Sequence, residues 1–425
     1  MSKKMCAKFP ESPLLTNPHK KRMMFIAWLW VFLCTASIFL IVPSARAIQN
    51  FVTEHWGRSF FGYMVLFAAA AGFLGVFYIL IFKLKIQSPS NYIWIFAITA
   101  VYVFVTLKLW ERPEEAVHFL EYGLLGFFLF RAFRFSIEDK SIYLAGFLAG
   151  SLVGIFDEIL QWAVPNRLWD LRDVGLNALS SGLFQVLLLK GIKPYLPQKR
   201  IRPKSIRIVS LLLAASIILL GLCLSNTPRR VMAYTKTFPL LSFLQKEEPM
   251  NEFKHRHEDP EIGIFYSRLT LNELNKIDRE DAKKNGRILR SWKNRKYDEF
   301  LRNFQGFRHP FLHEIRVHVF RRDNRYWRGV KSTDVEEKKE NFFIAYKENL
   351  ILEKYFGQTL QSSSYGWDKK KTSRTEAMID NDVPYRSPVS AGFFVPIKTK
   401  TMWAVIVVFL FVLIVLNLLI SRPKK

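Results

Sequence analysis

Eight long apolar runs constrain this chain more than any other feature of its sequence. A helix needs about 20 largely apolar residues to cross the hydrocarbon core of a bilayer. Such runs fold as helices in lipid, because unpaired backbone groups are costly there. We therefore predict eight membrane helices, of which the fourth and sixth are short and carry polar residues. The predicted ranges are 23–42, 63–82, 93–109, 117–133, 142–164, 174–189, 208–224 and 402–420.

The first apolar run has flanks that resemble those of a cleavable signal peptide. A cluster of basic residues ends at Arg22, just before the run, and the small-residue sequence Ala45-Arg46-Ala47 follows it. A signal peptide, however, has an apolar segment of only about 7–15 residues. Because this run is longer, we predict a retained membrane anchor that follows a cytoplasmic tail, residues 1–22.

Basic residues in the short loops predict the orientation of the helices. Cytoplasmic loops of membrane proteins carry an excess of Lys and Arg. On an eight-helix count the strongly basic loops all fall on one side, and the other short loops hold fewer basic residues. The basic positions on that side are Lys83, Lys85, Arg131, Arg134, Lys140, Lys190, Lys193, Lys199, Arg200, Arg202, Lys204, Arg207, Arg422, Lys424 and Lys425. We therefore predict a multi-pass protein with both termini in the cytoplasm and residues 226–400 outside it.

A change in composition divides the chain into domains. Residues 23–225 are dominated by apolar runs, residues 226–400 are polar and charged, and residues 401–425 hold the last run and a basic cytoplasmic tail. The net charge is +26, but no recognisable nucleic-acid module accompanies it, so a nucleic-acid partner is not predicted. The predicted fold class is an all-α polytopic membrane protein with a mixed α/β extracytoplasmic domain, 226–400, inserted before the last helix.

Local patterns within the polar domain predict both helices and a strand. Thr270 and Glu273 have the spacing of a capping box at the start of a helix. A later stretch alternates polar and apolar side chains, which is typical of a half-buried strand. The predicted ranges are 270–284 and 341–355 for helices, 314–320 for the strand, and 361–366 and 381–388 for loops.

A basic stretch with interleaved aromatic residues follows the predicted strand. It contains Arg321, Arg322, Arg325, Tyr326, Trp327 and Arg328. Such a stretch could bind an anionic polymer or a lipid headgroup. A solvated basic turn is the plainer interpretation, and both interpretations stay open.

Polar and ionisable residues gather at the predicted outer ends of the fourth, fifth and sixth membrane helices. Such groups are costly at membrane depth, so they pair with one another, face a wet cavity or have a function. Three helix ends can converge on one polar pocket that opens to the outer headgroup layer. The candidate residues are His118, Glu121, Tyr122, Asp157, Glu158, Gln161, Arg167, Asp170, Asp173 and Asn177.

A purely structural role for the same residues is the competing hypothesis. Arg167 and Arg172 would pair with the neighbouring acids and pin the loop between the fifth and sixth helices. Asp173 would then cap the sixth helix and complement its dipole. We favour a functional pocket, because acids, a histidine, an amide and an arginine come together from separate segments.

The spacing of these residues resembles that of the VanZ-like family of bacterial membrane proteins, within about residues 60–195. The matching pattern is His118-x-x-x-Tyr122, then Asp157-Glu158-x-x-Gln161-x-x-x-Pro165-x-Arg167-x-x-Asp170-x-x-Asp173-x-x-x-Asn177. The family is named for a protein that confers teicoplanin resistance. Two positions depart from the family pattern: Glu114-Glu115 stands in place of an Asp-Lys pair, and Ser180 in place of a glycine. The resemblance does not extend to residues 226–425.

The resemblance implies a non-enzymatic protein of the bacterial cytoplasmic (inner) membrane. It would influence glycopeptide or lipoglycopeptide susceptibility, or the handling of a lipid-linked envelope component. Its partners would be membrane lipid and a lipid-linked envelope precursor or a glycopeptide, and no cofactor is predicted.

Two other functions remain as alternatives. One is a membrane-embedded enzyme acting on an anionic lipid-linked substrate, with His118 as base and a divalent cation as cofactor. The cation ligands would be Asp157, Glu158, Asp170 and Asp173. The other is a transporter that uses the same residues as a proton relay. The apolar inner halves of these helices argue against transport.

Overall fold

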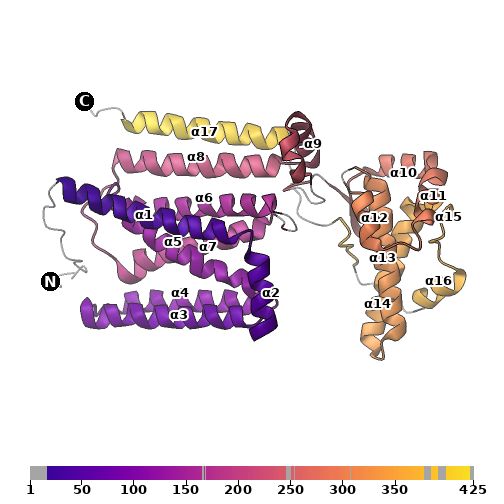
Figure 1. Ribbon diagram of the computed structural model, residues 1–425, viewed down its shortest axis with the longest axis horizontal. Helices are drawn as coiled ribbons and strands as arrows, with labels where there is room; N and C mark the ends of the chain where they lie inside the picture. Colours follow the sequence, from indigo (N-terminus) through magenta and orange to yellow (C-terminus); the bar gives the residue numbers. More distant parts are fainter. Residues whose placement is uncertain are drawn as a thin grey trace. The chain divides into compact units, whose positions relative to one another are not determined.

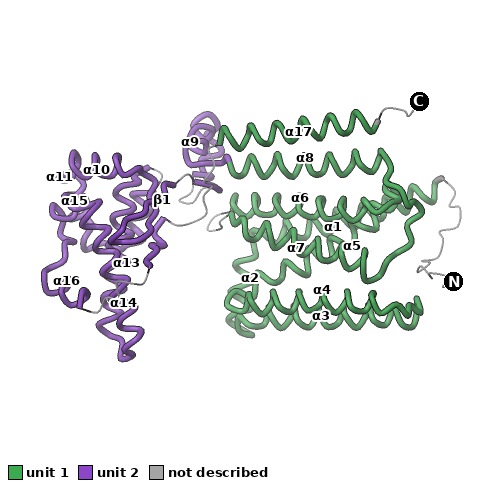
Figure 2. The backbone as a smooth tube through the Cα atoms, turned by 180° about the vertical axis from the view of Figure 1, so that it is seen from behind, with its two compact units in different colours: residues 1–224, 399–425 green, residues 225–398 purple. Residues whose placement is uncertain are grey.

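The computed structural model describes residues 17–164, 167, 169–245, 250–252, 254–306, 308–377, 384–390 and 399–421. Helices dominate this part of the chain, and its sheet has two short strands (Figure 1). The chain divides into two compact units. Unit 1 consists of Met1–Leu224 and Thr399–Lys425, and unit 2 consists of Ser225–Lys398 (Figure 2).

Unit 1 holds the helices that are long and apolar enough to cross a membrane. Eight such helices lie in the described ranges, and each coincides with one predicted apolar run. The prediction of eight candidate membrane helices is therefore confirmed, and it indicates a multi-pass membrane protein. The elements are α1 (Asn17–Ile41), α2 (Ala45–Trp56), α3 (Phe60–Tyr78), η1 (Ile79–Lys83), α4 (Pro89–Lys108), η2 (Pro113–Val117), α5 (His118–Phe133), α6 (Ser141–Ala163), α7 (Leu171–Val186), η3 (Leu187–Ile192), α8 (Pro203–Ser225) and α17 (Thr399–Ser421).

A row of glycines lets α6 and α7 approach each other closely at the centre of unit 1. Gly146, Gly150 and Gly154 recur every four residues and so share one face of α6. A Cβ at Gly150 would lie 2.1 Å from Ser181 Oγ, and one at Gly154 would lie 2.7 Å from Asn177 Cβ. Small residues of this kind allow tight helix packing in membrane proteins. The pairing is antiparallel, so the end of α6 lies beside the start of α7.

Polar side chains of α7 join this helix to α5. Ser180 Oγ donates to Phe119 O at 3.0 Å, and Gln185 Nε2 donates to Gly126 O at 3.0 Å. The pairing shows that α5 and α7 run in the same direction. The first turns of α5 and α7 and the last turn of α6 therefore lie at one end of unit 1.

Asp139 fastens the loop before α6 to the start of α8 at the opposite end of unit 1. It accepts hydrogen bonds from Ser141 N at 2.9 Å, Arg202 N at 3.1 Å and Ser205 Oγ at 2.7 Å. Burial raises the pKa of Asp139, but these hydrogen bonds outweigh burial, and the pKa lies below its ordinary value. α1 begins and α17 ends at this same end of the unit (Figure 1).

Unit 2 is mainly helical, with one small antiparallel sheet. Its elements are α9 (Pro228–Thr237), η4 (Pro239–Leu244), β1 (His255–Asp259), β2 (Gly263–Ser267), α10 (Leu271–Glu280), α11 (Ala282–Ser291), α12 (Tyr297–Asn303), α13 (Pro310–Lys331), α14 (Val335–Tyr355), α15 (Gly357–Gln361) and α16 (Lys369–Glu376). α13 and α14 pack along each other and carry much of the apolar core.

The stretch 314–320, predicted as a strand, is helical and lies within α13. The prediction was wrong because it took the polar residues of the alternation as solvent-facing. Glu314, Arg316 and His318 are all buried, because α13 packs against several elements. Inside the unit, Glu314 and His318 form hydrogen bonds, and the Arg316 guanidinium lies over the Tyr297 and Tyr365 rings. The arginines that follow continue the same helix, so the interpretation of a basic turn was also wrong.

Two predicted helices of unit 2 are present. The capping box is confirmed, since Glu273 N donates to Thr270 Oγ1 at 3.2 Å and Thr270 N donates to Glu273 Oε2 at 2.8 Å. The predicted helix is interrupted at Asp281, which separates α10 from α11. The helix predicted over 341–355 lies within α14.

The segment 384–390 pairs with the edge of β2. Ile264 N donates to Tyr385 O at 2.9 Å, and Ser387 N donates to Ile264 O at 2.9 Å. Gly263 has a φ of +107°, and a Cβ there would lie 2.2 Å from Tyr385 O, so this position requires glycine. Of the two predicted loops, 361–366 follows α15 without regular structure after residue 361, and 381–388 is described only from residue 384.

Candidate functional site

Three helix ends of unit 1 bring the predicted polar residues together. α5 contributes a histidine, a glutamate and a tyrosine from its first turns, and α6 contributes two acids and an amide from its last turns. The following loop and the start of α7 supply the remaining members. We call this set the polar cluster: His118, Glu121, Tyr122, Asp157, Glu158, Gln161, Arg167, Asp170, Asp173 and Asn177.

Tyr122 and Asp157 join α5 to α6. Both side chains are buried, and Tyr122 OH donates to Asp157 Oδ2 at 3.3 Å. One turn earlier on α5, His118 Nδ1 lies 3.4 Å from Glu121 Oε2. His118 is also near enough to Asp157 for their charges to interact. The three residues predicted to share a face of α5 therefore all take part in the cluster.

Gln161 links three members of the polar cluster. Its Nε2 donates to Glu158 Oε1 at 2.8 Å and to Asp157 Oδ2 at 3.4 Å, and its Oε1 accepts from Arg167 Nη2. Arg167 thus reaches the cluster through an amide, and it forms no ion pair with a carboxylate of the described residues. The predicted pairing of Arg172 with neighbouring acids is confirmed, since it forms ion pairs with Asp170 and Asp173. The predicted pairing of Arg167 with an acid was wrong, because the Gln161 side chain lies at its guanidinium.

The loop after α6 folds back on Glu158 and then begins α7. Asp170 N donates to Glu158 Oε2 at 3.3 Å, and the Asp170 side chain accepts from Arg172 N at 2.8 Å. Asp170 is therefore the N-cap of α7, and the assignment of this role to Asp173 was wrong. A cap needs the extended backbone that Asp170 has, whereas Asp173 already lies in the first helical turn.

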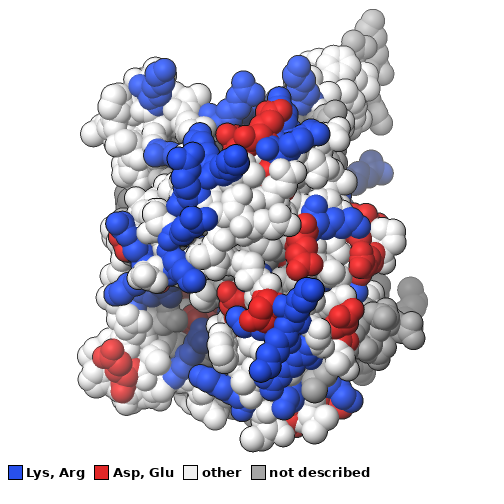
Figure 3. Space-filling model, turned by 90° about the vertical axis from the view of Figure 1, so that its right-hand side faces the viewer, with Lys and Arg blue, Asp and Glu red and all other residues white. Residues whose placement is uncertain are grey.

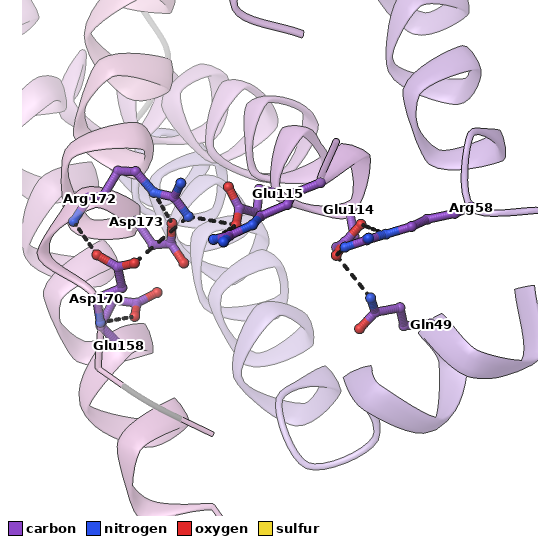
Figure 4. A network of polar contacts seen from close by, with 9 residues as sticks. Gln49, Arg58, Glu114, Glu115, Glu158, Asp170, Arg172 and Asp173 are labelled. Carbon is purple, nitrogen blue, oxygen red and sulfur yellow. Dashed lines mark hydrogen bonds and ion pairs between the residues drawn. The ribbon is translucent and has the colours of Figure 1, made fainter. Parts of the chain in front are cut away.

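Arg172 connects the cluster to a second set of charges that we did not predict (Figure 4). Its Nη2 donates to Glu115 Oε1 at 2.6 Å. The adjacent Glu114 accepts from Gln49 Nε2 at 2.9 Å and forms an ion pair with Arg58. Arg112, three positions before Glu115, also lies 3.5 Å from Glu115 Oε1. The acid pair was visible in the sequence, but Gln49, Arg58 and Arg172 are more than 50 positions away from it, and no local pattern identifies these three partners.

Four side chains of the cluster, those of His118, Asp157, Asp173 and Asn177, have buried polar atoms without a hydrogen-bond partner among the described residues. His118 Nδ1 lies 3.4 Å from Glu121 Oε2, and Asp173 Oδ1 lies 3.7 Å from Arg172 Nε. The other such atoms of the cluster are Asp157 Oδ1 and both amide atoms of Asn177. Asn177 is fully buried, with its Cβ packed toward Gly154. A buried polar group without a partner costs about 1–3 kcal/mol, and such groups are rare in native proteins. These atoms mark a place where a bound group would gain hydrogen bonds.

The acids of the cluster face different partners. Asp157 faces Tyr122 and Gln161, whereas Asp170 and Asp173 each lie 3.7 Å from Arg172 in ion pairs. Within the described ranges, no group of three or more His, Cys, Asp or Glu side chains is placed to hold a metal ion. Binding of a divalent cation by the four predicted acids stays a prediction. The carboxylate and amide groups of the polar cluster can bind a ligand that carries several hydrogen-bond donors.

No protein-family model, curated protein or solved structure matches this chain. The resemblance to the VanZ-like family therefore rests on the motif residues. Most of them lie in one cluster, and Ser180, which stands in place of the family's glycine, bonds to α5 through its hydroxyl.

Proposed function

We propose that this chain is a VanZ-like protein of the bacterial cytoplasmic membrane, and that its polar cluster binds a lipid-linked envelope component or a membrane-associated glycopeptide. The observation that carries the proposal is the set of unpaired atoms on Asp157 and Asn177, buried where three membrane helices meet. Such a ligand presents hydroxyl, amide or ammonium donors. These donors would bond to Asp157 Oδ1 and Asn177 Oδ1, and a hydroxyl or carbonyl oxygen of the ligand would accept from Asn177 Nδ2.

The partners of the charged groups favour a binding site over a structural plug. A plug would pair each buried carboxylate with a cation, because a buried charge without a partner is unstable. Arg167 instead donates to an amide, and Arg172 forms ion pairs with Glu115, Asp170 and Asp173 but not with Asp157. Among the described residues, Asp157 accepts hydrogen bonds only from the neutral donors Tyr122 and Gln161. A ligand donor would complete the coordination of this carboxylate.

The packing of α6 on α7 argues against transport through the same site. Beyond the cluster, buried polar residues continue along α7 at Ser181 and Gln185. They face the glycine row, where a Cβ would lie 2.1–2.8 Å from their side chains. Contacts this close leave no room for water or an ion beneath the cluster. The close packing of α6 on α7 therefore supports binding at one end of the helices rather than passage along them.

The orientation of unit 1 supports an outward-facing cluster. The basic loops, the start of α1 and the end of α17 share one end of the unit (Figure 1), and the polar cluster lies at the other end. The positive-inside rule then assigns both termini to the cytoplasm and the cluster to the outer leaflet. α8 starts beside Asp139 and runs toward the cluster end. Residues between α8 and α17 would accordingly be extracytoplasmic.

Substitution of the unpaired acid tests the proposal. Asp157→Asn should abolish the effect of the protein on glycopeptide or lipoglycopeptide susceptibility, measured as inhibitory concentration in cells with and without the protein. Asp173→Asn should do the same, and the double variant should add little, because both residues serve one site. Glu138→Gln, at the opposite end of unit 1, is the matched control and should have no effect.

Protein abundance decides between a binding defect and a folding defect. Immunoblots of membrane fractions should show equal amounts of each variant. A full effect retained by Asp157→Asn, or a loss that follows abundance alone, would contradict the binding proposal. Direct titration of teicoplanin onto the full chain in nanodiscs would then separate glycopeptide binding from the handling of a lipid-linked precursor.

A further inference from the structure

Unit 2 carries a pocket of about 450 Å³ on one face of α13. Arg321, Arg325 and Arg328 line it at spacings of four and three residues, so they share a single helix face. Phe320 belongs to the same face, and Pro388 and Val389 of the segment 384–390 form the opposite wall. The pocket therefore combines guanidinium groups with apolar surface. Arg322 of the same basic stretch is not part of it, because its side chain is buried and bonds to Asn349.

The charge of the pocket is not balanced by acids of the described residues. Arg321 Nε donates to Glu348 Oε1 at 3.0 Å, which pairs its charge. Arg325 Nη1 donates to Asn341 Oδ1 at 3.1 Å, a neutral acceptor. The Arg328 guanidinium forms no ion pair or hydrogen bond with another described residue. Two of the three arginines thus line the pocket without an acidic partner in the part of unit 2 that the structure describes.

The overall excess of basic residues does not by itself identify a site. On the face shown in Figure 3, Lys and Arg side chains form several patches, with Asp and Glu side chains between some of them. Most exposed charges of this kind are simply hydrated. The pocket differs because its arginines line a concave surface together with apolar residues. Ligand sites combine polar groups with an apolar lining in this way, whereas a hydrated patch needs neither a hollow nor apolar neighbours.

The walls of the pocket are held in place by bonds within unit 2. Tyr385 OH and Ser387 Oγ both donate to Glu348 Oε1, the same oxygen that accepts from Arg321. Glu348 is completely buried, so it fixes the arginine and the wall segment to one point. A preorganised pocket loses less entropy when a ligand binds.

We infer that this pocket is a binding site for a phosphate group joined to an apolar chain. A guanidinium presents a planar fork of donors that matches the oxygens of a phosphate. Arg325 and Arg328 supply such donors, and Phe320, Pro388 and Val389 supply the apolar contact. The phosphate can come from a membrane lipid headgroup or from a soluble phosphate ester. The site lies in unit 2 and does not rest on the function proposed for the polar cluster.

Calorimetric titration of the full chain in phosphatidylcholine nanodiscs tests this inference with hexyl phosphate and inorganic phosphate as probes. Hexyl phosphate should bind more tightly than inorganic phosphate, because only the ester reaches the apolar wall. Arg328→Gln should raise its Kd about tenfold, as expected for the loss of one charge-assisted hydrogen bond. Arg328 forms no ion pair or hydrogen bond with another described residue, so this variant should fold normally. Arg325→Gln should have a similar effect.

Arg279→Gln is the matched control, since Arg279 is an exposed arginine of α10 that does not line the pocket. It removes the same charge and should leave the Kd unchanged. An unchanged Kd for Arg328→Gln, an equal loss in Arg279→Gln, or no binding of either probe would overturn the inference.

A second arm identifies the source of the phosphate. Hexyl phosphate binding that weakens in nanodiscs containing phosphatidylglycerol supports a lipid headgroup as the natural occupant, because the two ligands compete. Binding that is the same in both nanodiscs supports a soluble phosphate ester.

Discussion

The two units bury acidic residues in different ways. In unit 2, the completely buried carboxylate of Glu348 has a donor on every side, and these donors are His318, Arg321, Tyr385 and Ser387. In unit 1, Asp157 is equally inaccessible, but its two donors are neutral and lie at 3.3–3.4 Å. One Asp157 oxygen has no partner among the described residues.

Glu348 stabilises its surroundings, whereas Asp157 has an oxygen that can accept a hydrogen bond from a ligand. Burial raises the pKa of Glu348, but the charge on His318 and the hydrogen bonds outweigh burial, so the pKa lies below its ordinary value. A fully bonded buried network rigidifies the fold, whereas a partly bonded one is costly unless something completes it. Unit 2 therefore uses Glu348 to assemble its fold, whereas unit 1 leaves Asp157 with an oxygen that the proposed ligand would occupy.

Removal of Glu348 should produce the largest effect. Glu348→Ala leaves Arg321 and His318 without their common acceptor, and loss of one partner of a buried pair costs about 3–5 kcal/mol. Hydrogen–deuterium exchange of the full chain in nanodiscs should show faster exchange throughout α13 and α14. Glu340→Ala, an exposed acid of the same helix α14, should change little. Equal exchange in Glu348→Ala and Glu340→Ala would contradict the stabilising role of Glu348.

A side chain at the glycine row should have the next largest effect. Gly150→Val places atoms where Ser181 Oγ lies, and overpacking of this kind costs about 1–3 kcal/mol. The variant should melt at a lower temperature, measured by thermal unfolding of detergent-solubilised protein. Gly75→Val is the control, because a Cβ there meets no atom within 4 Å. If Gly150→Val melts at the same temperature as Gly75→Val, α6 and α7 are loosely packed, and their packing no longer argues against transport.

Low pH should destabilise unit 2 through a second fully bonded carboxylate, that of Asp259. Burial raises its pKa, but Lys354 and Tyr355, at 2.7 Å each, and two backbone N–H groups lower it from 3.8 to about 2. A depressed carboxyl pKa stabilises the fold above the unfolded value, and this contribution is lost as the pH falls from about 4 to about 2.

The measurement is the pH dependence of exchange protection in unit 2. Asp259→Asn should remove part of the loss between pH 4 and pH 2, because the substituted residue cannot titrate. Glu258→Gln, an exposed neighbour, should keep the wild-type profile. Identical profiles for wild type and Asp259→Asn would show that other groups account for the acid response.

Substitution of Asp157 should have the smallest effect on stability, although this acid has the largest proposed role in function. Asp157→Asn keeps an acceptor for Tyr122 and removes no cationic hydrogen-bond partner, so the free energy of unfolding should change by less than about 1 kcal/mol. Thermal unfolding in detergent measures this change. A loss as large as that of Glu348→Ala would mean that Asp157 also holds the fold together, and the contrast between the units would disappear.

Much of unit 1 and some of the candidate site follow from local sequence. The apolar runs identify eight helices, because hydropathy over about 20 residues decides whether a segment suits a bilayer. The i, i+3, i+4 spacing of His118, Glu121 and Tyr122 also places them on one face, as we predicted. α2 was missed, because it is short and mixes polar with apolar residues.

Partners that lie far apart in the sequence could not be predicted. The ion pair of Arg172 with Glu115 and the bonds of Glu114 to α2 depend on how α2, η2 and α7 meet. The strand predicted over 314–320 failed for a related reason. Polar residues alternate there because long-range bonds bury them, not because one face is wet.

Local sequence identifies the candidate membrane helices, the capping box of α10 and the polar residues that gather at three helix ends. These features depend on hydrophobicity and on neighbours within one or two turns. Only the tertiary structure decided which acids are fully bonded and which keep a free oxygen. That difference depends on donors from other helices: the glycine row sets how closely α6 and α7 approach, and the segment 384–390 brings Tyr385 and Ser387 to Glu348.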